Sequence, residues 1–412
     1  MSLWGRLFRR TVPSTQAGRS LIAPPGRRLL VDLSTLAQQD AGTGIQRVVR
    51  SIWNLLEATR LDGFSVVAVA ATAKRGYCLA SIDGVNIGLP APDAPLVELG
   101  EGDIFLGLDL AAHRFWRHRR QIARWKRRGA TIAVVVYDLL PLREPDWFPA
   151  STVRHFGRWI RVIMRWGDIA FCISRQVASD LTALLQEKGA QRSPPFRIAL
   201  LPLCGDIRGS RPTSGIDDVG ADVLARMEER PTLLLVGTVE PRKAHAVLVD
   251  AFDHLRTLLG DAAPDLVIAG RPGWRTEDVQ RRMLEHPERG GAFHWISDAS
   301  DELLTGLYNR AALVVVPSFG EGFGLPVVEA LAHGRKVLAR DIPVLRELSR
   351  PGLSYFGSDA PDALAASILE SLGQADPLPG AADDDWAVSV ATLLDGLGID
   401  HGFSRDKGAR RA

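Results

Sequence analysis

The stretch Val314–Leu331, which reads VVVPSFGEGFGLPVVEAL, determines the fold of the second half of this 412-residue chain. Its apolar start predicts a buried strand, its glycine-rich middle a loop, and its apolar end a helix. Pro326 suits the first turn of that helix, where a missing backbone N–H costs nothing. Gly322 and Gly324 allow the backbone to approach a ligand closely. The amides at 323–325 would then point out of a helix N-terminus, which is a binding site for anions.

Two glutamates, Glu321 and Glu329, flank this loop with seven residues between them. A carboxylate beside a phosphate would be repulsive, so we expect both to face hydroxyl groups, which can donate hydrogen bonds to them. Amides for a diphosphate and carboxylates for sugar and ribose hydroxyls together suit a nucleotide sugar. Most glutamate pairs at this spacing are solvated, and the prediction therefore depends on the strand, loop and helix around them.

A second strand with a chemically suggestive end is predicted in Leu233–His245, LLLVGTVEPRKAH. A buried strand ends at Gly237, a helix follows from about Ala244, and Arg242 and Lys243 lie between them. Adjacent cations at the carboxyl end of a strand suit a departing diphosphate, because Arg binds as a fork and Lys as a point charge. An isolated Arg-Lys pair is more often a solvated basic turn.

Short continuous apolar runs recur along the whole chain, with helix-like segments between them. Continuous runs are typical of strands buried on both faces of a parallel sheet. They lie at 29–33, 66–71, 104–108, 131–136, 169–173 and 198–203 in the first half, and at 232–236, 266–269, 293–296, 313–316, 336–339 and 353–356 in the second. The predicted fold class is α/β, with two doubly wound Rossmann-like sheets.

The polar, breaker-rich stretch 205–215 is the best domain boundary. We expect a leader at 1–25, a first domain at 26–207, a second domain at 208–380, and a loose tail at 399–412. The leader has no apolar run of a signal peptide; it is either an interfacial segment or disordered. A last helix is expected at 386–398.

The composition is that of an ordinary globular chain, with 46% hydrophobic and 24% charged residues. Cys78, Cys172 and Cys204 are too few and too far apart for a disulfide framework or a zinc site. No apolar run is long enough to span a membrane. We therefore expect a cytoplasmic protein.

The two motif segments resemble the retaining nucleotide-sugar glycosyltransferases of family 4, also called glycosyl transferases group 1, which have the GT-B fold. The resemblance implies two Rossmann-like domains that face each other across a cleft, with the acceptor held by the first domain and the donor by the second. It also implies that the last helix, at 386–398, packs back on the first domain. The resemblance is densest from 233 to 348, and its overall character favours bacterial mannosyltransferases of surface polysaccharide synthesis. It extends to weaker matches at 42–47, 135–142, 172–174, 270–274 and 297–303. It implies a hexosyltransferase that moves a hexose, mannose as the first choice, from a nucleotide diphosphate sugar to a hydroxyl of a glycan or lipid-linked oligosaccharide.

The resemblance implies roles position by position. The predicted catalytic residues are Lys243, Arg242, Glu321 and Asp138. The predicted substrate-binding residues are Gly42, Thr43, Gly44, Gly237, Thr238, Arg271, Gly322, Phe323, Gly324, Leu325 and Glu329. Glu329 would bind the ribose hydroxyls, and the glycine loop at 42–44 would close over the diphosphate from the first domain.

Two positions depart from the family pattern. Thr238 stands where many members have an Arg, whose charge Arg242 would have to supply, and Tyr137 stands where many have a His that touches the donor sugar. The predicted mechanism uses cations and a helix N-terminus to stabilise the leaving diphosphate, without a protein nucleophile. No acidic metal cluster is placed near these motifs, so we expect no cofactor and no metal ion; the nucleotide, GDP or UDP, stays open.

Basic residues gather in the first half of the chain. Residues 1–207 hold 28 Lys and Arg against 17 Asp and Glu, whereas the remainder holds 22 against 31. They are densest in one predicted helix at 112–128, and a second set at helical spacing is Arg154, Arg158, Arg161 and Arg165. Trp residues are interleaved, which favours peripheral contact with the anionic inner face of the cell membrane over binding of nucleic acid. A solvated helix face is the alternative.

Two other classes of protein remain open. A dinucleotide-dependent oxidoreductase is weakly suggested because Gly42-Thr43-Gly44 begins like G-x-G-x-x-G, but Arg47 stands at the third glycine position. A catalytically inactive GT-B protein used for binding or scaffolding is the other alternative.

Overall fold

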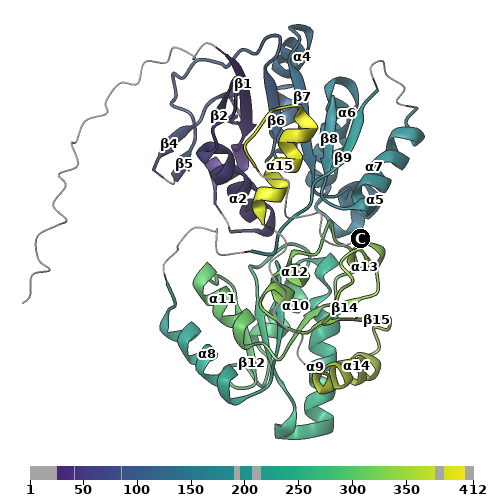
Figure 1. Cartoon of the computed structure of the whole chain (residues 1–412). Helices are drawn as coiled ribbons and strands as arrows, with labels where there is room; N and C mark the ends of the chain where they lie inside the picture. The colour runs from purple at the N-terminus through teal and green to yellow at the C-terminus, as the bar shows by residue number, and fades with distance from the viewer. Residues whose placement is uncertain are drawn as a thin grey trace, which may run out of the picture.

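The computed structural model describes residues 26–40, 42–84, 86–189, 195–206, 215–375 and 385–403. The predictions for the leader, for most of the linker and for the end of the tail lie outside these residues. Two parallel sheets stand one above the other in Figure 1, and each has helices packed around it.

The first sheet has the order β3-β2-β1-β6-β7-β8-β9, with only β3 antiparallel. Its strands are β1 (Arg27–Asp32), β2 (Phe64–Ala70), β3 (Cys78–Leu79), β6 (Ile104–Gly107), β7 (Thr131–Val136), β8 (Ile169–Cys172) and β9 (Arg197–Leu200). A separate hairpin joins β4 (Ser81–Asp83) and β5 (Asn86–Gly88). The helical segments of this first domain are α1 (Ser34–Gln38), α2 (Gly44–Ala58), α3 (Ala112–Arg117), α4 (Arg119–Arg127), α5 (Leu140–Arg143), η1 (Pro145–Trp147), α6 (Ala150–Trp166) and α7 (Arg175–Glu187).

The second sheet is entirely parallel, with the order β12-β11-β10-β13-β14-β15. Its strands are β10 (Thr232–Val236), β11 (Asp265–Ala269), β12 (Phe293–Ile296), β13 (Leu313–Val316), β14 (Val337–Arg340) and β15 (Leu353–Phe356). Its helical segments are α8 (Asp218–Glu229), η2 (Pro241–Lys243), α9 (His245–Leu259), η3 (Gly260–Ala262), α10 (Glu277–Leu284), α11 (Asp301–Arg310), α12 (Leu325–Ala332), α13 (Pro343–Arg346) and α14 (Pro361–Gly373).

The apolar runs are continuous because the second sheet has a core on each face. Leu234 and Val314 belong to one buried cluster, while Leu233 and Val315 belong to the other. Side chains of successive strand residues point to opposite faces, so both sets must be apolar when helices cover both faces. All twelve predicted runs coincide with a strand to within a few residues.

The predicted basic helix at 112–128 is two helices, and the single-helix prediction was wrong. α3 ends and α4 begins at His118, whose φ of −101° and ψ of 19° are not helical. The His118 ring forms a hydrogen bond of 2.8 Å with the carbonyl oxygen of Thr72. This tertiary contact holds the residue out of helical geometry, and periodicity alone contains no sign of it.

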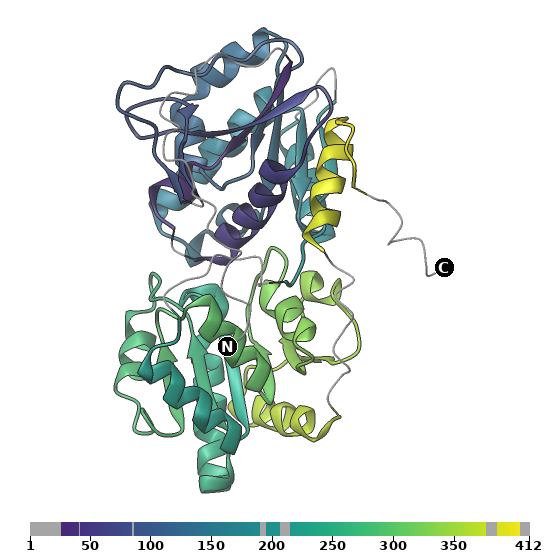
Figure 2. The same cartoon turned by 60° about the vertical axis from the view of Figure 1, so that its left-hand side comes forward.

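The last helix, α15 (Trp386–Leu397), packs against the first domain, as the yellow helix in Figure 2 shows. The Trp386 indole N–H donates to the carbonyl oxygen of Asp206 at 2.9 Å. Ser389 donates to the carbonyl oxygen of Pro202 at 2.6 Å. A Cβ at Gly396 would lie 2.5 Å from the Phe171 ring, so the close contact of α15 with β8 requires glycine there.

The two domains touch along the seam between the sheets. The Glu347 carboxylate accepts hydrogen bonds from the Arg175 and Gln176 amides, at 2.8 and 2.7 Å, and so occupies the N-terminus of α7. Trp274 donates to the carbonyl oxygen of Trp147 at 2.8 Å. These contacts hold the two carboxyl edges of the sheets face to face.

Candidate active site

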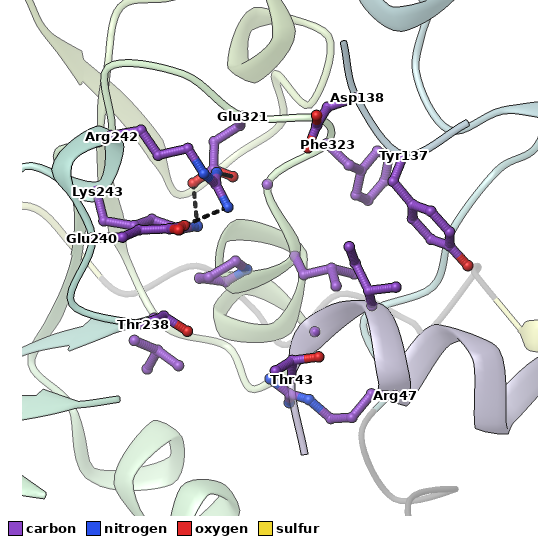
Figure 3. Close-up of a pocket in the computed structure, with 18 of the residues that line it drawn as sticks. Thr43, Arg47, Tyr137, Asp138, Thr238, Glu240, Arg242, Lys243, Glu321 and Phe323 are labelled. Carbon is purple, nitrogen blue, oxygen red and sulfur yellow. Dashed lines mark hydrogen bonds and ion pairs between the residues drawn. The ribbon is translucent and has the colours of Figure 1, made fainter. Parts of the chain in front are cut away.

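A cavity of about 410 Å³ lies between the carboxyl edges of the two sheets (Figure 3). Open α/β sheets bind ligands at this edge, near the point where the strand order reverses. Thirteen of the predicted site residues line it: Thr43, Gly44, Asp138, Gly237, Thr238, Arg242, Lys243, Arg271, Glu321, Gly322, Phe323, Gly324 and Leu325. Gly42 and Glu329, predicted as substrate-binding residues, do not line it.

Glu321 lies at the centre of a charged cluster in this cavity. The Lys243 ammonium is 2.5 Å from Oε1 and the Arg242 guanidinium is 2.9 Å from Oε2. Burial alone would raise the pKa of this carboxyl, but the two cations lower it to about 2. Glu321 is therefore ionised at neutral pH and holds both cations at the carboxyl end of β10.

Arg242 also joins the two predicted loops to each other. Its guanidinium donates to the carbonyl oxygen of Gly320 at 3.0 Å and lies 2.7 Å from Glu240. Its own carbonyl oxygen accepts a 2.7 Å hydrogen bond from the Phe319 amide. Burial opposes the charge of Arg242, yet Glu321 and Glu240 raise its pKa above the ordinary value. The Arg242 charge is thus shared between two carboxylates.

The glycine loop packs directly against the first domain. A Cβ at Gly322 would lie 2.0 Å from the Tyr137 carbonyl oxygen, which no side chain could tolerate. Gly324 has φ of +106° and forms the N-cap of α12, with a proline in the first turn of the helix. The loop therefore needs glycine at 322 because the Tyr137 carbonyl oxygen lies so near, and at 324 because the backbone is left-handed there.

Tyr137 and Asp138 follow β7, and their side chains point in different directions. The buried Tyr137 hydroxyl donates to the carbonyl oxygen of Leu108 at 2.8 Å, so the phenol points into the first domain. The Asp138 carboxyl lines the cavity and accepts from the Leu140 amide at 3.1 Å. Burial raises the pKa of Asp138. Of this pair, only Asp138 offers a polar side chain to the cavity.

Glu329 is buried behind the cavity wall, with 2% of its surface exposed. The Tyr308 hydroxyl donates to its Oε2 at 2.7 Å. The Arg47 guanidinium, from α2 in the first domain, lies 3.0 Å from its Oε1. Both carboxylate oxygens thus have protein partners.

The lining residues that the prediction missed include Arg47, Glu240 and Trp274. The sequence alone contains no sign that Arg47 crosses to the opposite domain. Glu240 could have been found, because a carboxylate two positions before Arg242 is a plausible ion-pair partner. Among the residues that the structure describes, no group of three or more His, Cys, Asp or Glu side chains could hold a metal ion.

Two Rossmann-like domains facing a shared cleft define the GT-B class of fold, and comparison with solved structures agrees. Sucrose-phosphate synthase from Thermosynechococcus elongatus matches with a TM-score of 0.61 and 15% identity, over 90% of this chain and 99% of that one. Anabaena Alr3699/HepE in complex with UDP-glucose matches with a TM-score of 0.61 and 12% identity, over the same shares of the two chains. The predicted fold class is confirmed.

Residues 230–374 match the family described as Glycosyl transferases group 1, so the second half of the chain carries a domain of that family. The serotype-specific mannosyltransferase WbdA of Escherichia coli is 34% identical over 382 residues, which is 90% of this chain and 45% of the relative. The O-antigen chain mannosyltransferase B of the same species is 36% identical over 154 residues, 37% of each chain. The chain spans about half the length of the WbdA relatives that it matches.

Proposed function

We propose that this chain transfers a hexose, with mannose as the first choice, from a nucleotide diphosphate sugar to a hydroxyl group of a glycan or lipid-linked oligosaccharide. The observation that carries the proposal is the Lys243–Glu321–Arg242 cluster at the carboxyl end of β10, inside the interdomain cavity. Relatives named as O-antigen mannosyltransferases support the hexose and the setting in surface polysaccharide synthesis.

The chemistry that we assign to the cluster is stabilisation of a leaving group. As the bond from the anomeric carbon to the phosphate oxygen breaks, negative charge grows on the diphosphate. Lys243, Arg242 and the amides at 323–325 would neutralise that charge, and Glu321 would hold the two cations in place. A new bond forms from the anomeric carbon to the acceptor oxygen, whose proton passes to the leaving phosphate on the same face, with retention.

Asp138 and Glu329 complete the proposed donor site. Asp138 lines the cavity from the first domain, and we assign it to the donor sugar hydroxyls. Glu329 would take the ribose hydroxyls by exchanging part of its contact with Arg47. No step in this scheme uses a metal ion.

The test is turnover with a panel of labelled nucleotide sugars and a lipid-diphosphate oligosaccharide acceptor. Lys243→Ala should lower kcat by about 100-fold or more, because the lost charge acts on the transition state. Lys188→Ala removes an exposed lysine of the first domain and should leave kcat unchanged. A near-wild-type rate in Lys243→Ala would sink the assignment.

Thermal-shift screening separates the alternatives. Ligand at 100 times its dissociation constant stabilises a protein by about 2.7 kcal/mol. We expect a shift with GDP or UDP; a shift with NAD alone would favour an oxidoreductase. Nucleotide binding without turnover on any donor would favour an inactive binding protein.

A second feature supports our proposal of peripheral contact with an anionic membrane from the cytoplasmic side. Arg119, Arg158 and Arg161 lie 4.3, 5.9 and 5.4 Å from the centre of the half-exposed Trp116 ring. α3 and α6, which carry most of this group, pack against each other. A tryptophan surrounded by guanidinium groups matches the headgroup region of an anionic bilayer. No helix in the described part of the chain is long and apolar enough to cross a membrane.

A further inference from the structure

Arg47 extends from the first domain into the wall of the donor cavity. It lies in the first turns of α2, directly after the loop that contains Thr43, and both residues are labelled in Figure 3. Its side chain is 14% exposed, and Nη1 lies 3.0 Å from Oε1 of Glu329 in the opposite domain. It is thus a cation that the first domain adds to a cavity whose other cations come from the second.

The carboxylate that faces Arg47 is held in one orientation. Tyr308 donates to the other oxygen of Glu329 at 2.7 Å. Burial and the neighbouring carboxylate both raise the pKa of Tyr308, so it keeps the proton that it donates. Glu329 is thus held at both oxygens, by Tyr308 and by Arg47, and a ribose hydroxyl that binds Oε1 would do so beside the guanidinium.

Two nitrogens of the Arg47 guanidinium donate no hydrogen bond within the described part of the chain. Among the described residues, Nε and Nη1 are buried and have no hydrogen-bond partner, since the contact with Glu329 is close without the angles of a hydrogen bond. Burial opposes the charge, but Glu329 raises the pKa of Arg47, so the group stays ionised. Buried donors without partners are costly, and an ionised fork of donors is satisfied best by a planar or tetrahedral oxyanion.

We propose that Arg47 is a donor-binding residue whose guanidinium bridges Glu329 and the phosphate nearest the ribose of a nucleoside diphosphate. The proposal rests on the donor site described under the proposed function. The ribose diol and the first phosphate of such a ligand are adjacent, so a side chain next to the carboxylate for the ribose is within reach of that phosphate. Arg47 would thus couple nucleotide binding to the position of the first domain.

The experiment measures binding of GDP, UDP and the matching phosphate-free nucleosides to wild type, Arg47→Gln and Arg47→Lys. Calorimetry serves for the diphosphates and NMR titration for the more weakly bound nucleosides. Arg47→Gln should weaken the better diphosphate by about 10- to 100-fold, the usual range for a charge-assisted hydrogen bond, and leave nucleoside affinity within about 2-fold. Arg47→Lys keeps the charge beside Glu329 without the fork and should show a smaller loss.

Arg128→Gln is the matched control, because it removes an arginine from the same domain at the exposed residue that follows α4, away from the cavity. Unchanged diphosphate affinity in Arg47→Gln overturns the proposal. An equal loss for diphosphate and nucleoside also overturns it, because Arg47 would then act only through Glu329 or domain contact. If the wild type binds neither diphosphate, the proposed function fails and this inference fails with it, whereas binding that is insensitive to Arg47 refutes the inference alone.

Discussion

At the scale of single residues, the site shows what motif spacing can and cannot predict. Arg242 and Lys243 were predicted at the end of a strand, and the structure brings both onto Glu321. The residue types predict attraction between them, but the distances depend on how two loops 78 residues apart fold onto each other. Glu240, which shares the Arg242 charge, was missed because a lone carboxylate in a turn is usually solvated.

Removing Arg242 should strongly destabilise the fold. Arg242→Met would leave two carboxylates, Glu240 and Glu321, buried with one cation fewer, at a cost of about 3–5 kcal/mol. The double variant Arg242→Met/Glu240→Gln should recover part of this loss, because one unpaired charge is gone. Chemical denaturation measures both. Arg281→Met, which breaks an exposed pair with Asp278, is the control and should cost less than about 1 kcal/mol.

A second residue-scale prediction concerns Asp32, which is buried at the end of β1. Burial raises its pKa to about 7, although Ser34 and Tyr77 donate hydrogen bonds to it. Because the folded pKa lies above the unfolded value, ionisation makes the fold progressively less stable from about pH 4 to pH 7. Asp32→Asn removes this decline, so its stability relative to wild type should be higher at pH 7.5 than at pH 5. Denaturation curves that give the same difference at both pH values would refute the assignment.

At the scale of elements, the local sequence pattern located the long buried strands but missed the short strands and one helix start. Buried parallel strands require continuous apolar runs, which is why β10 and β13 were located closely. β3 has only two residues and the β4–β5 hairpin three on each side, too few to show a period. The start of α9 was placed at Ala244, whose φ of +53° lies instead in the left-handed region.

Ala244 gives a prediction about this helix start. A left-handed alanine costs roughly 1–2 kcal/mol relative to its ordinary conformation, and glycine avoids most of that cost. Ala244→Gly should therefore raise the free energy of unfolding by about 1 kcal/mol. Ala246→Gly, inside the first turn of α9, should lower it by about the same amount, because glycine is a poor helix former. Thermal and chemical denaturation would test the pair, and a loss of stability in both variants would contradict the role of strain.

At the scale of the whole molecule, the near-neutral net charge of +2 conceals a basic and an acidic half. Part of the basic set is neutralised within its own domain: Glu98 pairs with Arg124 and Arg128, and Asp168 pairs with Lys126. The sequence predicted the excess of basic residues, but only the structure shows which arginines gather around the half-exposed Trp116 ring. The arginines around Trp116 are therefore the side chains to change in a test of membrane binding.

We predict that the protein binds anionic vesicles in a manner that weakens as salt rises. The triple variant Arg119→Gln/Arg158→Gln/Arg161→Gln should lower the partition coefficient by 10-fold or more, at about 1 kcal/mol per charge. Arg281→Gln/Arg289→Gln/Arg346→Gln makes the same change in net charge on the second domain and should have little effect. Sedimentation with phosphatidylglycerol vesicles measures both. If both triple variants lose the same fraction of vesicle binding, the binding depends on net charge alone and not on the arginines around Trp116.

The packing of α15 on the first domain has a consequence for how the cleft opens. The chain passes from the first domain to the second after Asp206 and returns at Trp386, and a hydrogen bond of 2.9 Å holds these two points together. Both covalent connections therefore meet the first domain at one edge. The contacts at Trp147 and at Glu347 are non-covalent and can separate. We expect the two domains to rotate apart about a hinge at that edge, so that substrates enter and leave the cleft from the opposite side.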